Sequence, residues 1–86
     1  MSTTPQEFPS DFPIKVMGRH DSDLRALTQT IIERHAGPIA DTRVKTRTSA
    51  DGNFLALTYM VHATSREQLY KIYRELTACK SVLMAL

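Results

Sequence analysis

Residues 43–63 read RVKTRTSADGNFLALTYMVHA, and they contain two runs in which apolar or β-branched side chains alternate with other side chains. A period of two is typical of β-strands, because successive side chains point to opposite faces of a sheet. The pair Asp51-Gly52 lies between the runs and is a strong signal for a hairpin turn. The stretch therefore predicts two antiparallel strands, over about 43–48 and 54–63.

The segment before the hairpin has the periodicity of a helix. Its apolar residues fall on one helical face, and this stripe consists of Leu24, Leu27, Ile31 and Ile32. Asp21 or Ser22 is the expected N-terminal cap. The pair Gly37-Pro38 is the expected stop, since Pro cannot continue a helix.

The segment after the hairpin predicts a second helix. Thr64 is followed three residues later by Glu67, and this spacing fits a capping box. The apolar stripe that follows consists of Leu69, Ile72, Tyr73 and Leu76. Its spacing again places one apolar face toward the rest of the protein.

Two more extended runs lie on either side of these elements. Residues 12–17 alternate between two faces, and Gly18 closes the run. In the last run Val82, Met84 and Leu86 alternate and are expected to face the core. The resulting order, β-α-β-β-α-β, predicts an α+β, ferredoxin-like two-layer sandwich with two helices on one face of an antiparallel sheet. We expect a single domain over 12–86 and a flexible N-terminal arm over 1–11.

Length and composition restrict the classes of function. A chain of 86 residues has no room for both a deep cleft and a complete core. The hydrophobic fraction of 42% and the charged fraction of 23% are those of an ordinary soluble domain. No run approaches the ~20 apolar residues that cross a bilayer. We therefore expect a cytoplasmic protein with no membrane partner.

Residues with catalytic or metal-binding potential are few. Cys79 is the only cysteine, so neither an internal disulfide nor a thiolate metal site within one chain is expected. His20, His35 and His62 share no periodic face and lie at no metal-ligand spacing. No nucleophile is paired with a base. The sequence therefore predicts no metal, no cofactor, no catalytic residue and no enzyme activity.

The sheet face without helices is the place where function is expected. The side chains predicted there are Lys15, Met17, Arg43, Lys45, Arg47, Phe54, Ala56, Thr58, Met60, His62, Leu83 and Ala85. They combine a basic strand with an apolar centre, and a contiguous exposed apolar patch often marks an interface. The alternatives are an ordinary solvated face and, for the basic strand, an edge that uses charge against aggregation.

Several short motifs occur together in this chain. They are Phe12-Pro13-Ile14-Lys15-Val16-Met17-Gly18, Arg34-His35-Ala36, Gly52-Asn53-Phe54, Ala63-Thr64 and Val82-Leu83-Met84-Ala85-Leu86. In these the chain resembles the YbeD-like family of small, uncharacterised bacterial proteins. The resemblance implies a ferredoxin-like fold with strand order 4-1-3-2, similar to ACT-type regulatory domains. It suggests a module that responds to a ligand or binds a protein.

The similarity to ACT-type domains also directs attention to the loop after the first strand. The candidate ligand loop is Gly18, Arg19 and His20, where a small metabolite with a carboxylate or phosphate could meet an Arg beside a helix N-terminus. Asp21 and Asp23 oppose an anion there, and a tight turn with a solvated Arg is the alternative. Acylphosphatases use an Arg in the same place, but their phosphate loop is longer.

The sequence thus predicts a non-catalytic binding module, regulatory or adaptor in kind, that acts through the open sheet face or a strand edge. Its partner is expected to be another protein or a second copy in a homodimer. An ACT-like sensor of a small metabolite is the alternative. Less expected are an acylphosphatase-like enzyme and a weak nucleic-acid binder that uses the basic residues of 43–47, because only Phe54 offers a base a stacking surface.

Overall fold

The structure is a computed structural model, and it describes residues 8–20 and 23–86. Its elements are β1 (Ser10–Arg19), α1 (Leu24–Ala36), a short 3₁₀ helix η1 (Asp41–Arg43), β2 (Val44–Thr48), β3 (Phe54–Ala63), α2 (Arg66–Ala78) and β4 (Val82–Ala85). The four strands form one antiparallel sheet in the order β2-β3-β1-β4. This is the predicted ferredoxin-like topology, and both the fold class and the strand order 4-1-3-2 are confirmed.

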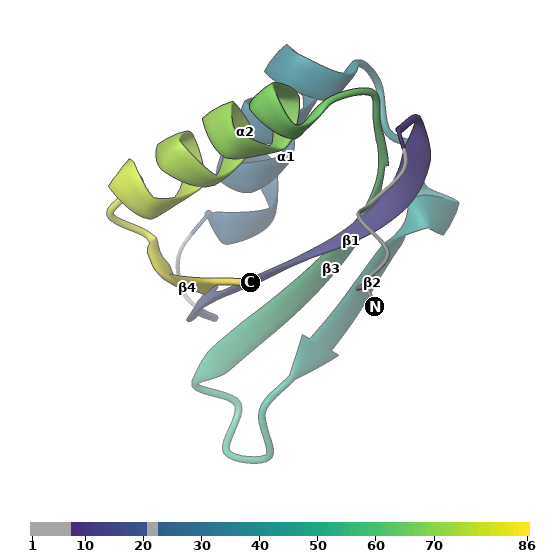
Figure 1. The fold of residues 1–86 in the computed structure, drawn as a ribbon. Coiled ribbons are helices and arrows are strands. Elements are labelled where there is room, and N and C mark those ends of the chain that lie inside the picture. The colour runs from purple at the N-terminus through teal and green to yellow at the C-terminus, as the bar shows by residue number, and fades with distance from the viewer. Residues whose placement is uncertain (1–7, 21–22) are drawn as a thin grey trace, which may run out of the picture.

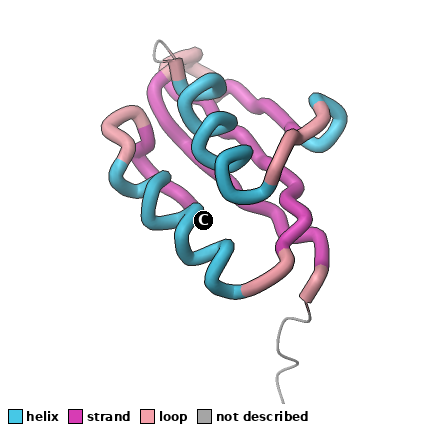
Figure 2. Tube along the Cα trace, turned by 90° about the horizontal axis from the view of Figure 1, so that it is seen from above, coloured by secondary structure: helices cyan, strands magenta, loops and turns pink. Residues whose placement is uncertain are grey.

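Both helices lie on one face of the sheet, and no described helix covers the opposite face (Figure 1). Seen from the helix side, the two helices run over the strands as a separate layer (Figure 2). The core fills the space between the layers and consists of Ile14, Val16, Leu24, Ile32, Leu57, Tyr59, Val61, Ala63, Leu69, Ile72 and Leu76. The helices therefore leave the other sheet face free to act as a contact surface.

The stripe predicted for α2 is confirmed, while that of α1 is rotated. Leu27 is 40% exposed, and the buried position one residue later belongs to Thr28. The Thr28 hydroxyl donates to the Leu24 carbonyl at 2.8 Å and lies 2.7 Å from the Tyr59 hydroxyl. A threonine can be buried here because both hydroxyl groups find hydrogen-bond partners. Burial raises the pKa of Tyr59, so the hydroxyl stays neutral.

The helix ends differ from the predictions in one detail. Gly37, with φ of 82°, caps α1 as expected. The N-terminal cap of α2 is Ser65 instead of Thr64, because the Ser65 hydroxyl accepts the Gln68 N–H at 3.1 Å. Gln68 in turn accepts the Thr64 N–H at 2.7 Å. The cap is thus moved by one residue, and the return bond from Gln68 goes to the residue before the cap. The proposed caps Asp21 and Ser22 lie outside the described residues.

The first strand is longer than its apolar alternation indicated. β1 begins at Ser10, which pairs with Ala63, and ends at Arg19, which pairs with Phe54. Ser10 and Asp11, assigned to the arm by the sequence, are strand residues because backbone pairing with β3 continues past the apolar run. Phe8 packs against the core, and residues 1–7 of the expected arm lie outside the described residues.

The hairpin is held by a network at its turn. Gly52 has a φ of 78°, which glycine adopts without strain. Asp51 accepts the Ser49 hydroxyl at 2.7 Å and the Asn53 N–H at 3.0 Å, and these bonds lower the pKa of Asp51. The turn therefore fixes the register of β2 against β3. In the described residues, neither helix is long and apolar enough to cross a membrane.

Candidate interaction face

The pairing registers decide which side chains share the open face. Lys15 in β1 lies opposite Thr58 in β3, and Thr58 lies opposite Lys45 in β2. Side chains two positions along each strand lie on the same face. The predicted positions on β1, β2 and β3 are therefore on the open face: Lys15, Met17, Lys45, Arg47, Phe54, Ala56, Thr58, Met60 and His62.

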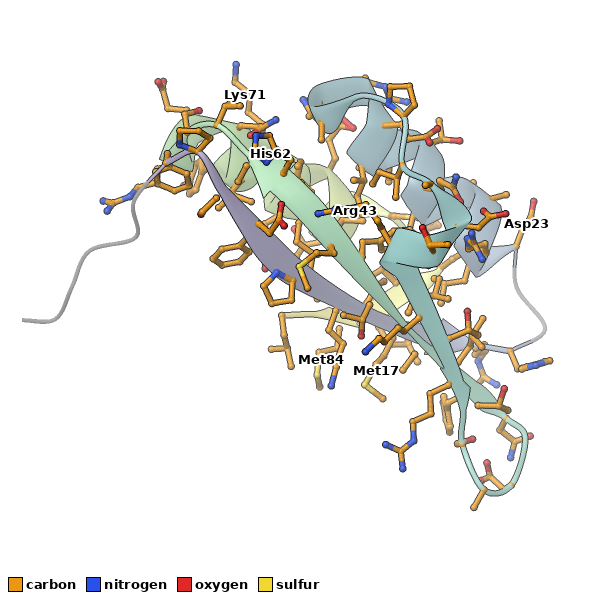
Figure 3. All side chains as sticks on the ribbon, turned by 90° about the vertical axis from the view of Figure 1, so that its right-hand side faces the viewer. Met17, Asp23, Arg43, His62, Lys71 and Met84 are labelled. Atoms are coloured by element: carbon orange, nitrogen blue, oxygen red, sulfur yellow. The ribbon has the colours of Figure 1, made fainter. Side chains whose placement is uncertain are left out.

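β4 corrects the prediction for the last strand. A register shift places Met84 opposite Met17 and Val82 opposite Gly18, so Leu83 is an extra residue between the two pairs. Such a bulge reverses the alternation beyond it. Met84, expected in the core, consequently lies on the open face. Figure 3 shows the Met17 and Met84 side chains next to each other there.

The same bulge changes the positions that follow. Ala85 was predicted on the open face, but it pairs with Val16 and packs against the core. Leu86 was predicted in the core, but it exchanges backbone hydrogen bonds of 2.9 and 2.7 Å with Lys15 and therefore shares the open face with it. Leu83 is 60% exposed at the bulge itself. The sequence missed Met84 and Leu86 because Val82–Leu86 is apolar throughout, so nothing in it marks a bulge.

One side of the face is apolar. We call Met17, Phe54, Met84 and Leu86 the apolar strip. Phe54 is 37% exposed, Met84 49% and Leu86 64%. The lining of a shallow hollow of about 160 Å³ beside the strip includes Met17, Phe54, Ala56 and Arg47. Exposed apolar strips of this kind often mark contact sites.

The β2 side is basic, although less so than predicted. Lys45 and Arg47 are exposed on β2. Arg43 lies in η1, where its guanidinium contacts Asp11 at 2.9 Å and donates to the Met60 carbonyl at 3.1 Å. Only two of the three predicted basic residues therefore lie on β2 without an ion pair among the described residues, because Arg43 is paired with Asp11. His62 lies 3.4 Å from the same Asp11 carboxylate.

The candidate ligand loop is mostly part of the sheet. Gly18 and Arg19 belong to β1, and the His20 N–H donates to the Asn53 carbonyl at 2.8 Å. A Cβ on Gly18 would lie 2.4 Å from the Ser81 carbonyl oxygen and 2.8 Å from a Leu24 methyl carbon. Gly18 is therefore needed for close packing inside the protein, and its backbone is not open to a ligand.

The histidines occupy separate elements. His20 follows β1, His35 lies in α1 and His62 in β3. Within residues 8–20 and 23–86, no three His, Cys, Asp or Glu side chains are grouped as metal ligands would be. On the described part of the open face, Phe54 is the only Phe or Tyr, so successive bases would find one stacking surface.

A small ionic cluster joins the two helices on the outer surface. His35 Nε2 lies 3.0 Å from Glu75 Oε2, and Arg34 pairs with the other carboxylate oxygen. Gln68 donates to the His35 carbonyl at 3.0 Å. The hydrogen bond with His35, aided by the charge of Arg34, lowers the pKa of Glu75 below its ordinary value of 4.5.

This lowered pKa predicts an acid-dependent loss of stability. Glu75 contributes stability above about pH 4.5, and the contribution is lost as the pH falls further and the folded protein takes up the proton. The denaturation midpoint of Glu75→Gln should therefore fall less than that of the wild type between about pH 6 and about pH 3.5. Glu67→Gln, on the same helix, is the control. Equal acid sensitivity of the wild type and Glu75→Gln would contradict the prediction.

Comparison with known proteins identifies the family. A family model described as a protein of unknown function, DUF493, matches residues 3–86. The chain belongs to the DUF493 family. A UPF0250 protein of Paraburkholderia phytofirmans is 44% identical over 93% of this chain and 90% of the relative. One from Chromobacterium violaceum is 46% identical with the same coverage, and one from Ralstonia nicotianae is 44% identical over 93% and 82%.

Membership in DUF493 confirms the resemblance to a family of small, uncharacterised bacterial proteins. No solved structure gave a significant match. The DUF493 description names no activity or ligand.

Proposed function

We propose that this chain is a non-catalytic binding module of the bacterial cytoplasm that pairs with a second copy of itself through the apolar strip. The observation that carries the proposal is the exposure of Met84 and Leu86 beside Met17, on a sheet face that no described helix covers. Burial of such side chains contributes roughly 25 cal/mol for each Å² removed from water. Met is also suited to adaptable contacts, because its side chain is flexible and polarisable.

The charge distribution supports a second copy as the partner. Residues 81–86, which form the outer margin of the apolar strip, contain no charged side chain. In a two-fold symmetric pair each patch meets its own equivalent, so uncharged side chains along this margin can contact one another without repulsion. Strand β4 is also an edge of the sheet, and its backbone can approach a second copy.

Substitution of Met84 by Glu tests this proposal. Wild-type protein should show twice the mass of one chain in light scattering at micromolar to millimolar concentration. Met84→Glu should weaken the pair by a factor of about 30 or more, because a carboxylate would be desolvated at the contact. Tyr70→Glu is the matched control, since Tyr70 is 66% exposed on α2, in the other layer. A monomeric wild type, or a Met84→Glu variant that still pairs, would contradict the proposal.

A metabolite sensor of the ACT kind makes a different prediction. A small ligand that binds only the folded protein would raise its thermal stability by RT ln(1 + [L]/Kd). The packing of Gly18 against Ser81 and Leu24 gives this alternative less support, because it fills the place where a ligand was expected. A gain in melting temperature with a metabolite, retained in monomeric Met84→Glu, would favour the sensor.

A further inference from the structure

Strand β2 forms the other edge of the sheet, and its outward backbone groups can be assigned. Lys15 exchanges both backbone hydrogen bonds with Leu86, so its N–H and C=O point toward β4. Thr58 in β3 lies opposite Lys15, and its N–H and C=O therefore point toward β2, where Thr58 pairs with Lys45. Because bonded and non-bonded pairs alternate along an antiparallel ladder, the N–H and C=O of Thr46 point away from the sheet.

The side chains of this edge carry unbalanced positive charge. Lys45 and Arg47 are exposed on the open face, two positions apart. Within the described residues no carboxylate forms an ion pair with either of them. The acidic residues before and after β2 have other partners: Asp41 pairs with Arg25 at 3.1 Å, and Asp51 is bonded to Ser49.

Two shallow hollows on the open face have these basic residues in their linings. Lys45 lines the first, of about 270 Å³, together with Met60 and Thr58. Arg47 lines the second, of about 160 Å³, together with Phe54. Each hollow therefore has at least one apolar and one cationic side chain in its lining. Alternate side chains of an added strand would lie on the same face as Lys45 and Arg47, since such side chains share one face.

A second copy of this chain does not suit the β2 edge. Pairing of β2 with β2 in a two-fold dimer would bring Lys45 and Arg47 close to the same residues of the other copy. Like charges directly opposite one another in a sheet are destabilising. Pairing of this edge with a second copy is therefore disfavoured, and pairing with a segment of opposite charge is favoured. A charged edge provides specificity in this way.

We infer that the β2 edge binds an extended acidic segment of a partner protein, which adds as a fifth strand beside Thr46 and places carboxylates against Lys45 and Arg47. The inference rests on the proposed function as a binding module. It adds a second binding surface and states the chemical character of the partner. Backbone hydrogen bonds of the added strand provide affinity, and the two basic side chains select acidic residues at alternate positions.

The probe is an end-blocked peptide, Thr-Val-Glu-Val-Glu-Val-Thr, with a fluorophore for anisotropy. A peptide with Lys in place of both Glu residues is its control. We expect the acidic peptide to bind the wild type at least about tenfold more tightly than the Lys peptide, with weaker binding at higher salt. In the double variant Lys45→Glu, Arg47→Glu the preference should reverse. An absence of preference in the wild type would overturn the inference.

Thr46→Pro separates strand addition from simple charge attraction. The Thr46 N–H points away from β3, so proline removes the donor for an added strand and leaves the bonds between β2 and β3 intact. We expect Thr46→Pro to reduce acidic-peptide binding about tenfold or more and Thr46→Ala to retain it. Unchanged binding by a folded Thr46→Pro variant would overturn the inference, as would oligothymidylate binding tighter than the acidic peptide and unaffected by Thr46→Pro.

The outcomes for the two surfaces are independent. If the peptide fails to bind while Met84→Glu still dissociates the pair, the β2 inference fails and the proposed function stands. If the wild type is monomeric and the acidic peptide binds as expected, self-pairing fails and the β2 edge remains as the binding surface.

Discussion

Gly18→Val should lower the free energy of unfolding by about 3 kcal/mol, at the upper end of the usual cost of overpacking. The first added carbon would lie 2.4 Å from the Ser81 carbonyl oxygen, which is far inside van der Waals contact. That oxygen belongs to the backbone that leads into β4, so it cannot move away as a flexible side chain would. A Leu24 methyl carbon at 2.8 Å blocks the other direction.

Urea denaturation followed by circular dichroism measures this loss. Gly52→Ala is the control, because no described atom beyond Gly52 and its two chain neighbours lies within 4 Å of its added carbon, so its cost comes from a φ of 78°. Replacing glycine by another residue at a position with left-handed backbone conformation costs about 1–2 kcal/mol of stability. If Gly18→Val is no less stable than Gly52→Ala, the close contact between β1, α1 and the start of β4 is not as described.

Tyr59→Ala is expected to have an effect of about 3–5 kcal/mol, the range for removing a large buried ring. Tyr59 is fully buried in β3 under both helices and is the largest of the fully buried side chains. Its loss would leave a cavity between the layers and would also remove a partner of the buried Thr28 hydroxyl. The variant should unfold at a much lower urea concentration than the wild type.

Tyr59→Phe separates the ring from the hydroxyl. This variant keeps the packing and removes only the contacts to Thr28 at 2.7 Å and to the Arg25 carbonyl at 3.3 Å. We expect a loss of about 1 kcal/mol, because Thr28 keeps its bond to Leu24. A loss in Tyr59→Phe as large as that in Tyr59→Ala would show that the hydroxyl, and not the ring, holds α1 to the sheet.

The fold could be predicted from the sequence because local patterns and tertiary packing agree in most elements. The alternation in 43–48 and 54–63 corresponds to a real hairpin, and the stripe of Leu69, Ile72 and Leu76 is the buried face of α2. Where each element has one apolar face, only a few arrangements bury all of those faces together. The order of elements was therefore sufficient to predict the layers, while the strand order was predicted from the resemblance to the YbeD-like family.

The open face was harder to predict because it depends on details that have no local signal. A single extra residue at Leu83 moves Met84 and Leu86 to the other side of the sheet, and an unbroken apolar run hides that change. Thr28 is buried only because Tyr59 approaches it from a distant strand. In the sequence, Gly18 looks like part of a ligand-binding loop. Its structural role, close packing against Ser81, depends on a contact between distant parts of the chain.

The central position of β1 has a consequence for how the chain reaches this structure. Ser10 pairs with Ala63 and Val16 with Ala85, so the strand made early in synthesis is completed by partners made much later. Of the three strand pairings, only that between β2 and β3 is local. Distant contacts of this kind slow folding, because the intervening chain must first be ordered. During synthesis the edge of β1 that faces β4 therefore stays unpaired until β4 has been made, and an unpaired strand edge is prone to aggregation in that interval.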